Sequence, residues 1–232
     1  SLLYYIIEMN KYFLLVFYLM LPLLMVSCTT SYSPMNTKYP NLNSYMSDMD
    51  ILANDDSDVV VCSGYNCNFK TEIKFTDSDR EMIHDIFNKR DFRTPYEERE
   101  MIAAAVAKIE KVVGIIVGTE NDKGGVLENE FIGNIEKQDC VDESASTTTY
   151  LKYFQDNELI FMHSIVVPQS RGALIDGRWP HFSATIKDKK NKKQYVVDSW
   201  YRDNGEPPVI MELQDWVYDW RRSSQVRDEQ LN

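Results

Sequence analysis

Residues 94–118 have the sequence TPYEEREMIAAAVAKIEKVVGIIVG, and this stretch decides much of the fold. Thr94 is a typical helix N-cap, Pro95 suits the first helical position, and Glu97 completes a capping box. Apolar residues then recur at helical spacing, which predicts an apolar stripe that packs on a core. These residues are Ile102, Val106, Ile109, Val113 and Ile116. Gly118 predicts the end of this long helix.

Shorter patterns on both sides of this helix predict the remaining elements. The predicted strands are 59–62, 69–75, 159–167, 179–187 and 194–200; the predicted helices are 76–88 and 139–155, with a short closing helix near 213–220. The last two strands form a hairpin, and a loop is expected over 169–178. Because most helices precede most strands, we expect an α+β domain in which helices pack on an antiparallel sheet.

The composition excludes some classes of function. Lys and Arg number 25 and Asp and Glu number 36, so the formal net charge is 25 − 36 = −11. This balance argues against binding to nucleic acid, which requires a basic surface. Hydrophobic residues make up 44% of the 232 residues, which is enough for a buried core. With three His and four Cys, we expect neither a metal site nor a cofactor.

The N-terminal residues have the pattern of a targeting segment. A short polar start at Met9 precedes an apolar stretch over 12–26, which is shorter than the roughly 20 residues that a membrane span needs. Residues 25–28, MVSC, resemble the lipobox of bacterial lipoproteins, in which the Cys is lipidated. We therefore expect a signal peptide over 1–27, a translation start at Met9 and a lipid on Cys28. The alternative is an uncleaved anchor or an ordinary signal peptide.

This targeting pattern predicts the domain organisation and the location. Residues 28–57 are rich in polar residues without periodicity, so we expect a flexible tether that joins the lipid to a folded domain over 58–232, with its core at about 94–220. Thr29 stands where lipoproteins retained at the inner membrane have Asp. The resemblance therefore implies a protein of the bacterial cell envelope, attached to the outer membrane and facing the periplasm.

An oxidising compartment affects how the cysteines are interpreted. Cys62 and Cys67 flank a predicted turn, so we expect a local disulfide rather than a metal site. Cys140 is then left without an obvious partner at the first turn of the helix that Asp139 opens. A helix N-terminus stabilises a thiolate. Asp142 and Glu143 oppose that effect unless they point into solvent.

His181 and Asp198 lie on the two strands of the predicted hairpin. If the turn is centred between Lys190 and Asn191, Ser183 lies opposite Asp198. His181 and Asp198 are then diagonal neighbours on one face of the sheet, roughly 7 Å apart or less at Cβ. Asp198 would orient one imidazole nitrogen and leave the other for Cys140. A register shift of one residue would separate them.

The order Cys, His, Asp on a helix start and two antiparallel strands resembles the transglutaminase-like branch of the papain-like cysteine hydrolases. The motifs are DCVDES over 139–144, RWPHFSA over 178–184 and YVVDSW over 195–200. The resemblance covers about 94–220 and is greatest to an uncharacterised group of proteobacterial proteins. It implies a transglutaminase-like (papain-like) domain with Cys140 as nucleophile, His181 as base and Asp198 as orienting acid.

The sequence departs from the papain-like pattern at the oxyanion hole. Gln138 lies only two residues before the cysteine, whereas papain-like enzymes place their glutamine further upstream. Gln138 and the backbone amide of Cys140 both remain candidate donors. The candidate walls of the cleft are Trp179, Trp200, Tyr201 and Arg202.

These observations favour a lipid-anchored cysteine hydrolase that acts on amide or peptide bonds through a thioester. Its expected partners are a peptide or protein substrate, including peptidoglycan peptides, and the membrane through its lipid. The alternative is an inactive binding or scaffolding lipoprotein on the same fold, which the acidic neighbours of Cys140 favour. A redox role is disfavoured because no second Cys lies in the motif.

Overall fold

The computed structural model describes residues 38–88, 94–172 and 180–218. The expected signal peptide, the lipidation site Cys28, and the candidate cleft residue Trp179 lie outside the described residues. No helix in the described ranges is both long enough and apolar enough to span a membrane.

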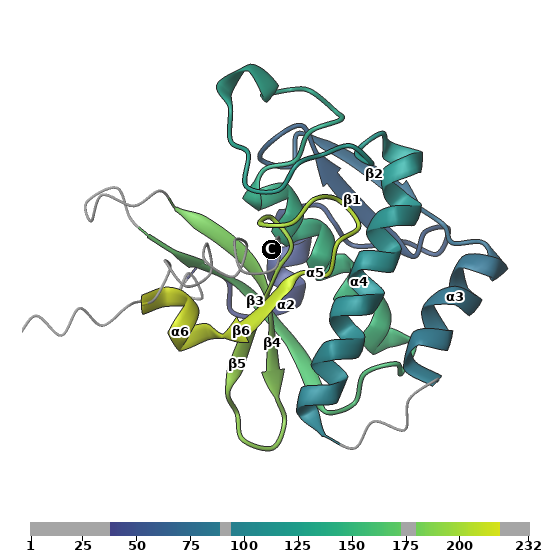
Figure 1. Ribbon diagram of the computed structural model, residues 1–232, viewed down its shortest axis with the longest axis vertical. Helices are drawn as coiled ribbons and strands as arrows, with labels where there is room; N and C mark the ends of the chain where they lie inside the picture. The colour runs from purple at the N-terminus through teal and green to yellow at the C-terminus, as the bar shows by residue number, and fades with distance from the viewer. Residues whose placement is uncertain (1–37, 89–93, 173–179, 219–232) are drawn as a thin grey trace, which may run out of the picture. The chain divides into compact units, whose positions relative to one another are not determined.

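The described chain is α+β, as the sequence predicted (Figure 1). Its helices are α2 (Leu42–Asp48), α3 (Asp77–Asn88), α4 (Pro95–Val117), α5 (Cys140–Asp156) and α6 (Leu213–Tyr218), with a 3-10 turn, η2, at Asn129–Phe131. Its strands are β1 (Val59–Ser63), β2 (Phe69–Ile73), β3 (His163–Arg171), β4 (His181–Asp188), β5 (Gln194–Asp198) and β6 (Val209–Glu212). β1 and β2 form an antiparallel pair, and the other four strands form an antiparallel sheet in chain order.

The two long helices begin where their capping residues predicted. Thr94 caps α4 and Asp139 caps α5, each through a reciprocal capping box. Gly118 ends α4 in a left-handed conformation with φ of 96°. The predicted stripe of α4 is buried except for Ile116, whose side chain is 57% exposed, and Val117 packs into the core in its place. The stripe prediction was therefore wrong at its last position.

The hairpin of β4 and β5 has the register that the sequence predicted. Ala184 lies opposite Val197 and Lys187 opposite Gln194, so the turn is centred between residues 190 and 191. Ala184 and Val197 face the core that α4 and α5 cover, whereas His181 and Asp198 lie on the other pleat. This register places the imidazole and the carboxylate on one side of the sheet.

The strand predicted over 159–167 begins later and ends later than expected. The Glu98 carboxylate of α4 accepts hydrogen bonds from the backbone N–H groups of Phe161 at 2.7 Å and His163 at 2.8 Å, and from the His163 ring at 2.6 Å. These bonds occupy the amides that an earlier strand would need. β3 instead pairs with β4 from His163 to Arg171, with an irregularity between Val166 and Gln169, and so enters the predicted loop.

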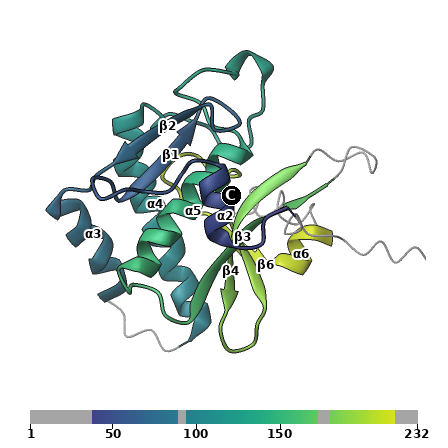
Figure 2. The same cartoon turned by 180° about the vertical axis from the view of Figure 1, so that it is seen from behind.

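The prediction of a tether over 28–57 was wrong for the residues that the structure describes. α2 and the turn after it pack on the domain, close to β3 (Figure 2). Tyr45, Met46 and Ile51 are buried and join an apolar cluster with Val60 and Val167. The apolar residues of this segment do not follow a long helical period, so no local pattern predicts that they contribute to the core.

We expect Met46→Ala to lower the free energy of unfolding by about 2–5 kcal/mol, because a 2% exposed side chain leaves a cavity. Leu52→Ala is the matched control, since Leu52 is 48% exposed, and it should change stability by less than about 1 kcal/mol. Urea denaturation of the full chain measures both. Equal, small effects of the two substitutions would show that α2 does not pack as described.

Candidate functional site

Cys140 is the first residue of α5 and the free cysteine of the described chain. Its side chain is buried, and burial is the largest cause that raises the pKa of its thiol to about 12. The backbone amide of Phe182 and its own amide approach the sulfur and act in the opposite direction, while the charges of Asp139 and Asp198 add to the rise. The sulfur therefore lies beside the start of β4, and the resting thiol is neutral at pH 7.

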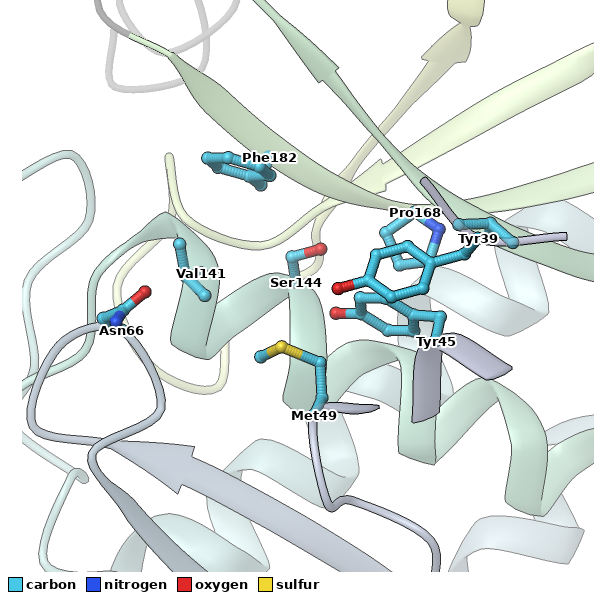
Figure 3. Close-up of a pocket in the computed structure, with 9 residues that line it drawn as sticks. Tyr39, Tyr45, Met49, Asn66, Val141, Ser144, Pro168 and Phe182 are labelled. Atoms are coloured by element: carbon cyan, nitrogen blue, oxygen red, sulfur yellow. The ribbon is translucent and has the colours of Figure 1, made fainter. Parts of the chain in front are cut away.

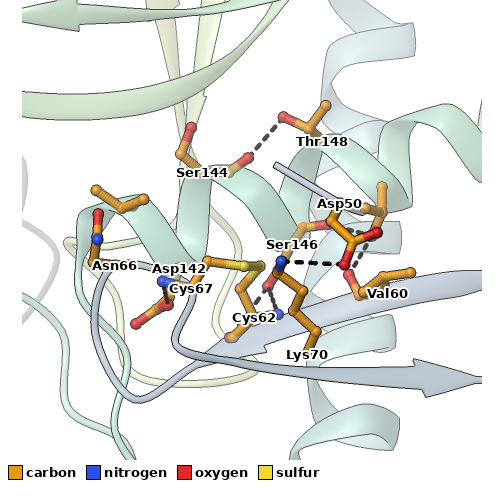
Figure 4. The surroundings of a disulfide bond; sticks show 12 residues. Asp50, Val60, Cys62, Asn66, Cys67, Lys70, Asp142, Ser144, Ser146 and Thr148 are labelled. Atoms are coloured by element: carbon orange, nitrogen blue, oxygen red, sulfur yellow. Dashed lines mark hydrogen bonds and ion pairs between the residues drawn. A yellow bond between two sulfur atoms is a disulfide. The ribbon is translucent and has the colours of Figure 1, made fainter. Parts of the chain in front are cut away.

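Two carboxylates at the start of α5 bind a row of backbone amides from the loop between β1 and β2, and Figure 4 shows one of them, Asp142, beside Cys67 of this loop. Asp142 accepts hydrogen bonds from the N–H groups of Tyr65 at 2.8 Å and Cys67 at 2.6 Å. Asp139 accepts one from the N–H of Asn66 at 3.0 Å. Tyr65, Asn66 and Cys67 have φ angles of 66°, 55° and 55°, which L residues adopt at a cost. The carboxylates thus hold a loop conformation that is unfavourable on its own.

The same two carboxylates also fix the helix start. Asp139 accepts from the N–H groups of Val141 and Asp142, and Asp142 accepts from the N–H of Asp139. Cys62 and Cys67 form a disulfide, as their spacing led us to expect, and it closes the loop on the other side. We call this arrangement of Asp139, Asp142 and the 65–67 amides the helix clasp. It fixes the position of the backbone that carries Cys140.

The acidic neighbours of Cys140 do not point into solvent. Asp142 and Glu143 are both buried, so the possibility that solvent screens them is wrong. Burial, followed by the charge of Asp139, raises the pKa of Asp142 to about 8, against the effect of the amides that it accepts from. Burial, followed by the charge of Glu110, raises the pKa of Glu143 well above its ordinary value. Burial therefore disfavours a negative charge on both groups, and this weakens their opposition to a thiolate at Cys140.

His181 and Asp198 form the pair that the register predicted. His181 Nε2 and Asp198 Oδ2 are 2.8 Å apart. Trp216 of α6 donates its indole N–H to the same oxygen at 2.8 Å. The imidazole packs against three rings, with centroids 4.9 Å from Trp200, 5.1 Å from Tyr201 and 5.5 Å from Trp216. The ring contacts hold the His181 imidazole in position, and the bond from Trp216 holds the Asp198 carboxylate.

Sequence reasoning missed Trp216 and Arg171 as parts of the site. Arg171 Nη1 donates to the backbone carbonyl of Trp216 at 2.9 Å, and its guanidinium lies 4.7 Å from the Trp216 ring centroid. It also donates to the Tyr201 hydroxyl. Trp216 was predicted only as part of a closing helix. Its bond to Asp198 spans 18 residues, and no local pattern indicates it.

The arrangement leaves one imidazole nitrogen for chemistry. Because Nε2 donates to Asp198, the neutral ring carries its lone pair on Nδ1. Nδ1 is buried and has no hydrogen-bond partner within the described ranges. His181 begins β4, and the sulfur of Cys140 in α5 lies beside the backbone amide of the next residue, Phe182, but no hydrogen bond joins the sulfur to the ring among the described residues. The structure thus contains the His181–Asp198 pair of the predicted triad. The Cys140 thiol lies next to the residue that follows His181.

The structure gives Gln138 a different partner from the expected one. Its side-chain N–H donates to the carbonyl of Cys62 on β1 at 2.8 Å, and its backbone N–H donates to Asp122 at 3.2 Å. The Gln138 side chain therefore ties the helix start to β1. The prediction that it donates to an oxyanion beside the sulfur is not supported, because its N–H is directed at the Cys62 carbonyl. The backbone N–H of Cys140, which approaches the sulfur, remains the candidate donor.

The cleft candidates fall into two groups. Trp200 and Tyr201 contact His181 and are half-buried, so they wall the imidazole. Tyr201 and Arg202 also line a cavity of about 320 Å³. Its other lining residues are Lys123, Gly124, Val126, Asp203 and Glu206. Arg202 therefore lines the same cavity as Tyr201, one of the residues that wall the imidazole.

The described residues contain no group of three or more His, Cys, Asp and Glu side chains that could hold a metal ion. Comparisons of the chain with protein-family models, curated proteins and solved structures found no match.

We expect Asp142→Asn to lower the free energy of unfolding by about 2 kcal/mol, because an NH₂ group would replace an oxygen that accepts backbone N–H bonds. Asp156→Asn on the same helix is the matched control. Its ion pair with Lys152 is exposed and should contribute less than about 0.5 kcal/mol. Urea denaturation of the two variants checks the helix clasp, and equal losses would contradict it.

The buried Glu110 should make stability depend on pH. Burial raises the pKa of Glu110 to about 7, while its Oε2 accepts from Gly205 N–H at 3.0 Å. The folded state then holds a proton that the unfolded state has released above about 4.5. The contribution of Glu110 to stability is therefore greatest below that pH and falls by up to about 1.4 kcal/mol per pH unit until pH reaches about 7.

Between pH 4.5 and pH 7, the free energy of unfolding of Glu110→Gln should fall by about 3 kcal/mol less than that of the unmodified chain, because the amide of Gln stays neutral. Urea midpoints at the two pH values measure the loss. Glu120→Gln, at an exposed position after α4, is the control and should retain the pH dependence of the unmodified chain. An unchanged pH dependence in the Glu110 variant would contradict the raised pKa.

Proposed function

We propose that this protein is a cysteine hydrolase that cleaves amide or peptide bonds on a transglutaminase-like fold. The observation that carries the proposal is the His181–Asp198 pair in the predicted register, with Cys140 at the start of the adjacent helix. The bond to Asp198 directs the imidazole so that Nδ1 is its basic atom. A base oriented by a third group beside a nucleophile is the arrangement that covalent acyl transfer requires.

The proposed reaction begins with a neutral thiol. His181 Nδ1 accepts the proton of Cys140 as the sulfur attacks the carbonyl carbon, so no resting ion pair is needed. The tetrahedral intermediate collapses, the C–N bond breaks, and His181 gives the proton to the leaving amine. The acyl group then remains on sulfur as a thioester.

The second half of the reaction releases the acyl group. His181 Nδ1 accepts a proton from water, the resulting hydroxide attacks the thioester, and the C–S bond breaks. His181 then returns the proton to the departing sulfur, so that the products are a carboxylic acid and the free thiol of Cys140. In both halves the backbone N–H of Cys140 is the proposed donor to the oxyanion, and Asp198 holds the imidazole through Nε2.

The envelope location completes the proposal. A lipid on Cys28 would attach the domain to the outer membrane, facing the periplasm, where peptide or protein substrates occur. The disulfide between Cys62 and Cys67 supports an oxidising compartment. The net charge of −11 makes nucleic acid a poor partner.

One observation favours a second function, that of a binding lipoprotein without turnover. Cys140 is only 9% exposed, and burial raises the pKa of its thiol to about 12. A free thiol has a pKa of about 8.5, so Cys140 holds its proton more firmly. A protein of this kind would use the same fold to hold a ligand while the thiol stays inert.

Alkylation of Cys140 by iodoacetamide distinguishes the two functions. We expect His181→Ala to slow alkylation by about tenfold or more at pH 8, because the proton acceptor is lost. Asp198→Asn should slow it less, because the base remains but its orientation weakens. Mass spectrometry of the peptide that contains Cys140 measures the rate in the full chain, separately from that of Cys28.

His84→Ala is the matched control. The imidazole of His84, in α3, lies 3.5 Å from the hydroxyl of Tyr153, which is near the other end of α5 from Cys140. This variant should react at the rate of the unmodified chain. If the His181 and His84 variants react equally fast, or if Cys140 does not react at all, the hydrolase proposal fails and the binding function is left.

A further inference from the structure

An apolar cavity of about 170 Å³ adjoins the start of α5. Val141 and Ser144 of α5, Phe182 of β4, and Tyr45 of α2 contribute to its walls (Figure 3). The remaining lining residues are Tyr39, Met49, Asn66, Val167 and Pro168. None of the nine carries a formal charge at pH 7, so the cavity suits an uncharged group.

The cavity is lined by residues that flank the proposed nucleophile, Val141 beside it in the chain and Phe182 beside its sulfur. Ser144 lies one helical turn after Cys140, and residues four apart share a helix face. The backbone amide of Phe182 approaches the Cys140 sulfur, while the Phe182 ring forms one wall of the cavity. A group bound in the cavity would therefore be attached to an amide within reach of the sulfur.

The hydroxyls of the cavity gather at one end. In Figure 3 the oxygens of Tyr39, Tyr45 and Ser144 point toward the same space. Tyr39 already donates to Asp48 at 2.6 Å. Ser144 Oγ is buried and makes no hydrogen bond of regular geometry with any described residue. The remaining walls are aliphatic or aromatic, which is typical of a pocket that binds apolar groups and orients them through few polar atoms.

We infer that this cavity binds a large, uncharged apolar side chain, aromatic or branched, of the substrate's acyl part. The inference rests on the proposed function, because it places the side chain next to the amide that Cys140 attacks. The volume suits such a group, since an apolar cavity of about 150 Å³ in another protein binds benzene. A charged side chain would lose its hydration there without gaining a partner. Peptides with acidic or basic residues at this position are therefore excluded.

The 38–49 segment contributes to the walls of this cavity. Tyr39, Tyr45 and Met49 form one side of the cavity, and the segment lies outside the 94–220 region that carries the catalytic motifs. The segment therefore contributes to the choice of substrate and not only to the core.

Dipeptidyl chloromethyl ketones test the inference, because they alkylate a cysteine that binds their side chains. The sulfur forms a thioether, chloride leaves, and the thiol proton passes to the buffer. One residue of each probe is Gly, and the other is Phe, Leu, Glu or Gly, at either position. We expect the Phe and Leu probes to modify Cys140 at least about tenfold faster than the Glu and Gly probes.

Two substitutions should shift this preference in opposite directions. Val141→Phe fills the cavity, so the ratio of the Phe-probe rate to the Gly-probe rate should fall to about one. Met49→Ala enlarges it, so a naphthylalanine probe should gain relative to the Leu probe. Ile116→Phe, at an exposed position on α4, is the matched control and should leave every ratio unchanged.

The outcomes separate this inference from the proposed function. If iodoacetamide alkylation depends on His181 but the probes show no side-chain preference, the hydrolase proposal stands and the cavity inference is wrong. If the preference appears but Val141→Phe does not alter it, the side chain binds elsewhere and the inference is also wrong. If Cys140 reacts with no reagent, both fail together.

Discussion

The helix clasp is the constraint on which the rest of the site depends. Six backbone N–H groups converge on two carboxylates, three from the loop between β1 and β2 and three from the start of α5. The loop is held in three consecutive left-handed residues, which it would not adopt alone. Because Cys140 lies between Asp139 and Asp142, the same bonds that hold the loop fix the sulfur relative to β4.

Local signals in the sequence predicted the parts of the fold that local chemistry controls. The capping residues Thr94 and Asp139 located the starts of α4 and α5, and the short turn after Lys190 located the register of β4 and β5. That register was sufficient to pair His181 with Asp198, because side chains alternate strictly along a strand. The half of the site that depends on local pairing was therefore predictable.

Tertiary contacts decided the remaining features, and no local pattern reports them. Trp216 reaches Asp198 from another element, and Glu98 delays β3 by occupying its first amides. Gln138 had the right residue type for an oxyanion donor, but β1 offered its amide the carbonyl of Cys62. α2 was missed because a helix of seven residues gives a weak periodic signal, and packing rather than propensity stabilises it.

Burial of the Cys140 thiol opposes its deprotonation, whereas the His181–Asp198 pair provides an oriented base that could accept its proton. Burial favours the neutral form of the Cys140 thiol, so this site does not favour a mechanism that starts from a resting thiolate. In the proposed mechanism, His181, whose other nitrogen is held by Asp198, acts as a base only during attack, when the sulfur loses its proton to Nδ1. Such a site requires accurate positioning of the substrate before the proton is transferred, because a neutral thiol is a weaker nucleophile than a thiolate. In the proposed mechanism, a substrate side chain bound in the cavity that Val141 and Phe182 line would supply that placement, because it would exclude water and fix the carbonyl carbon against the sulfur.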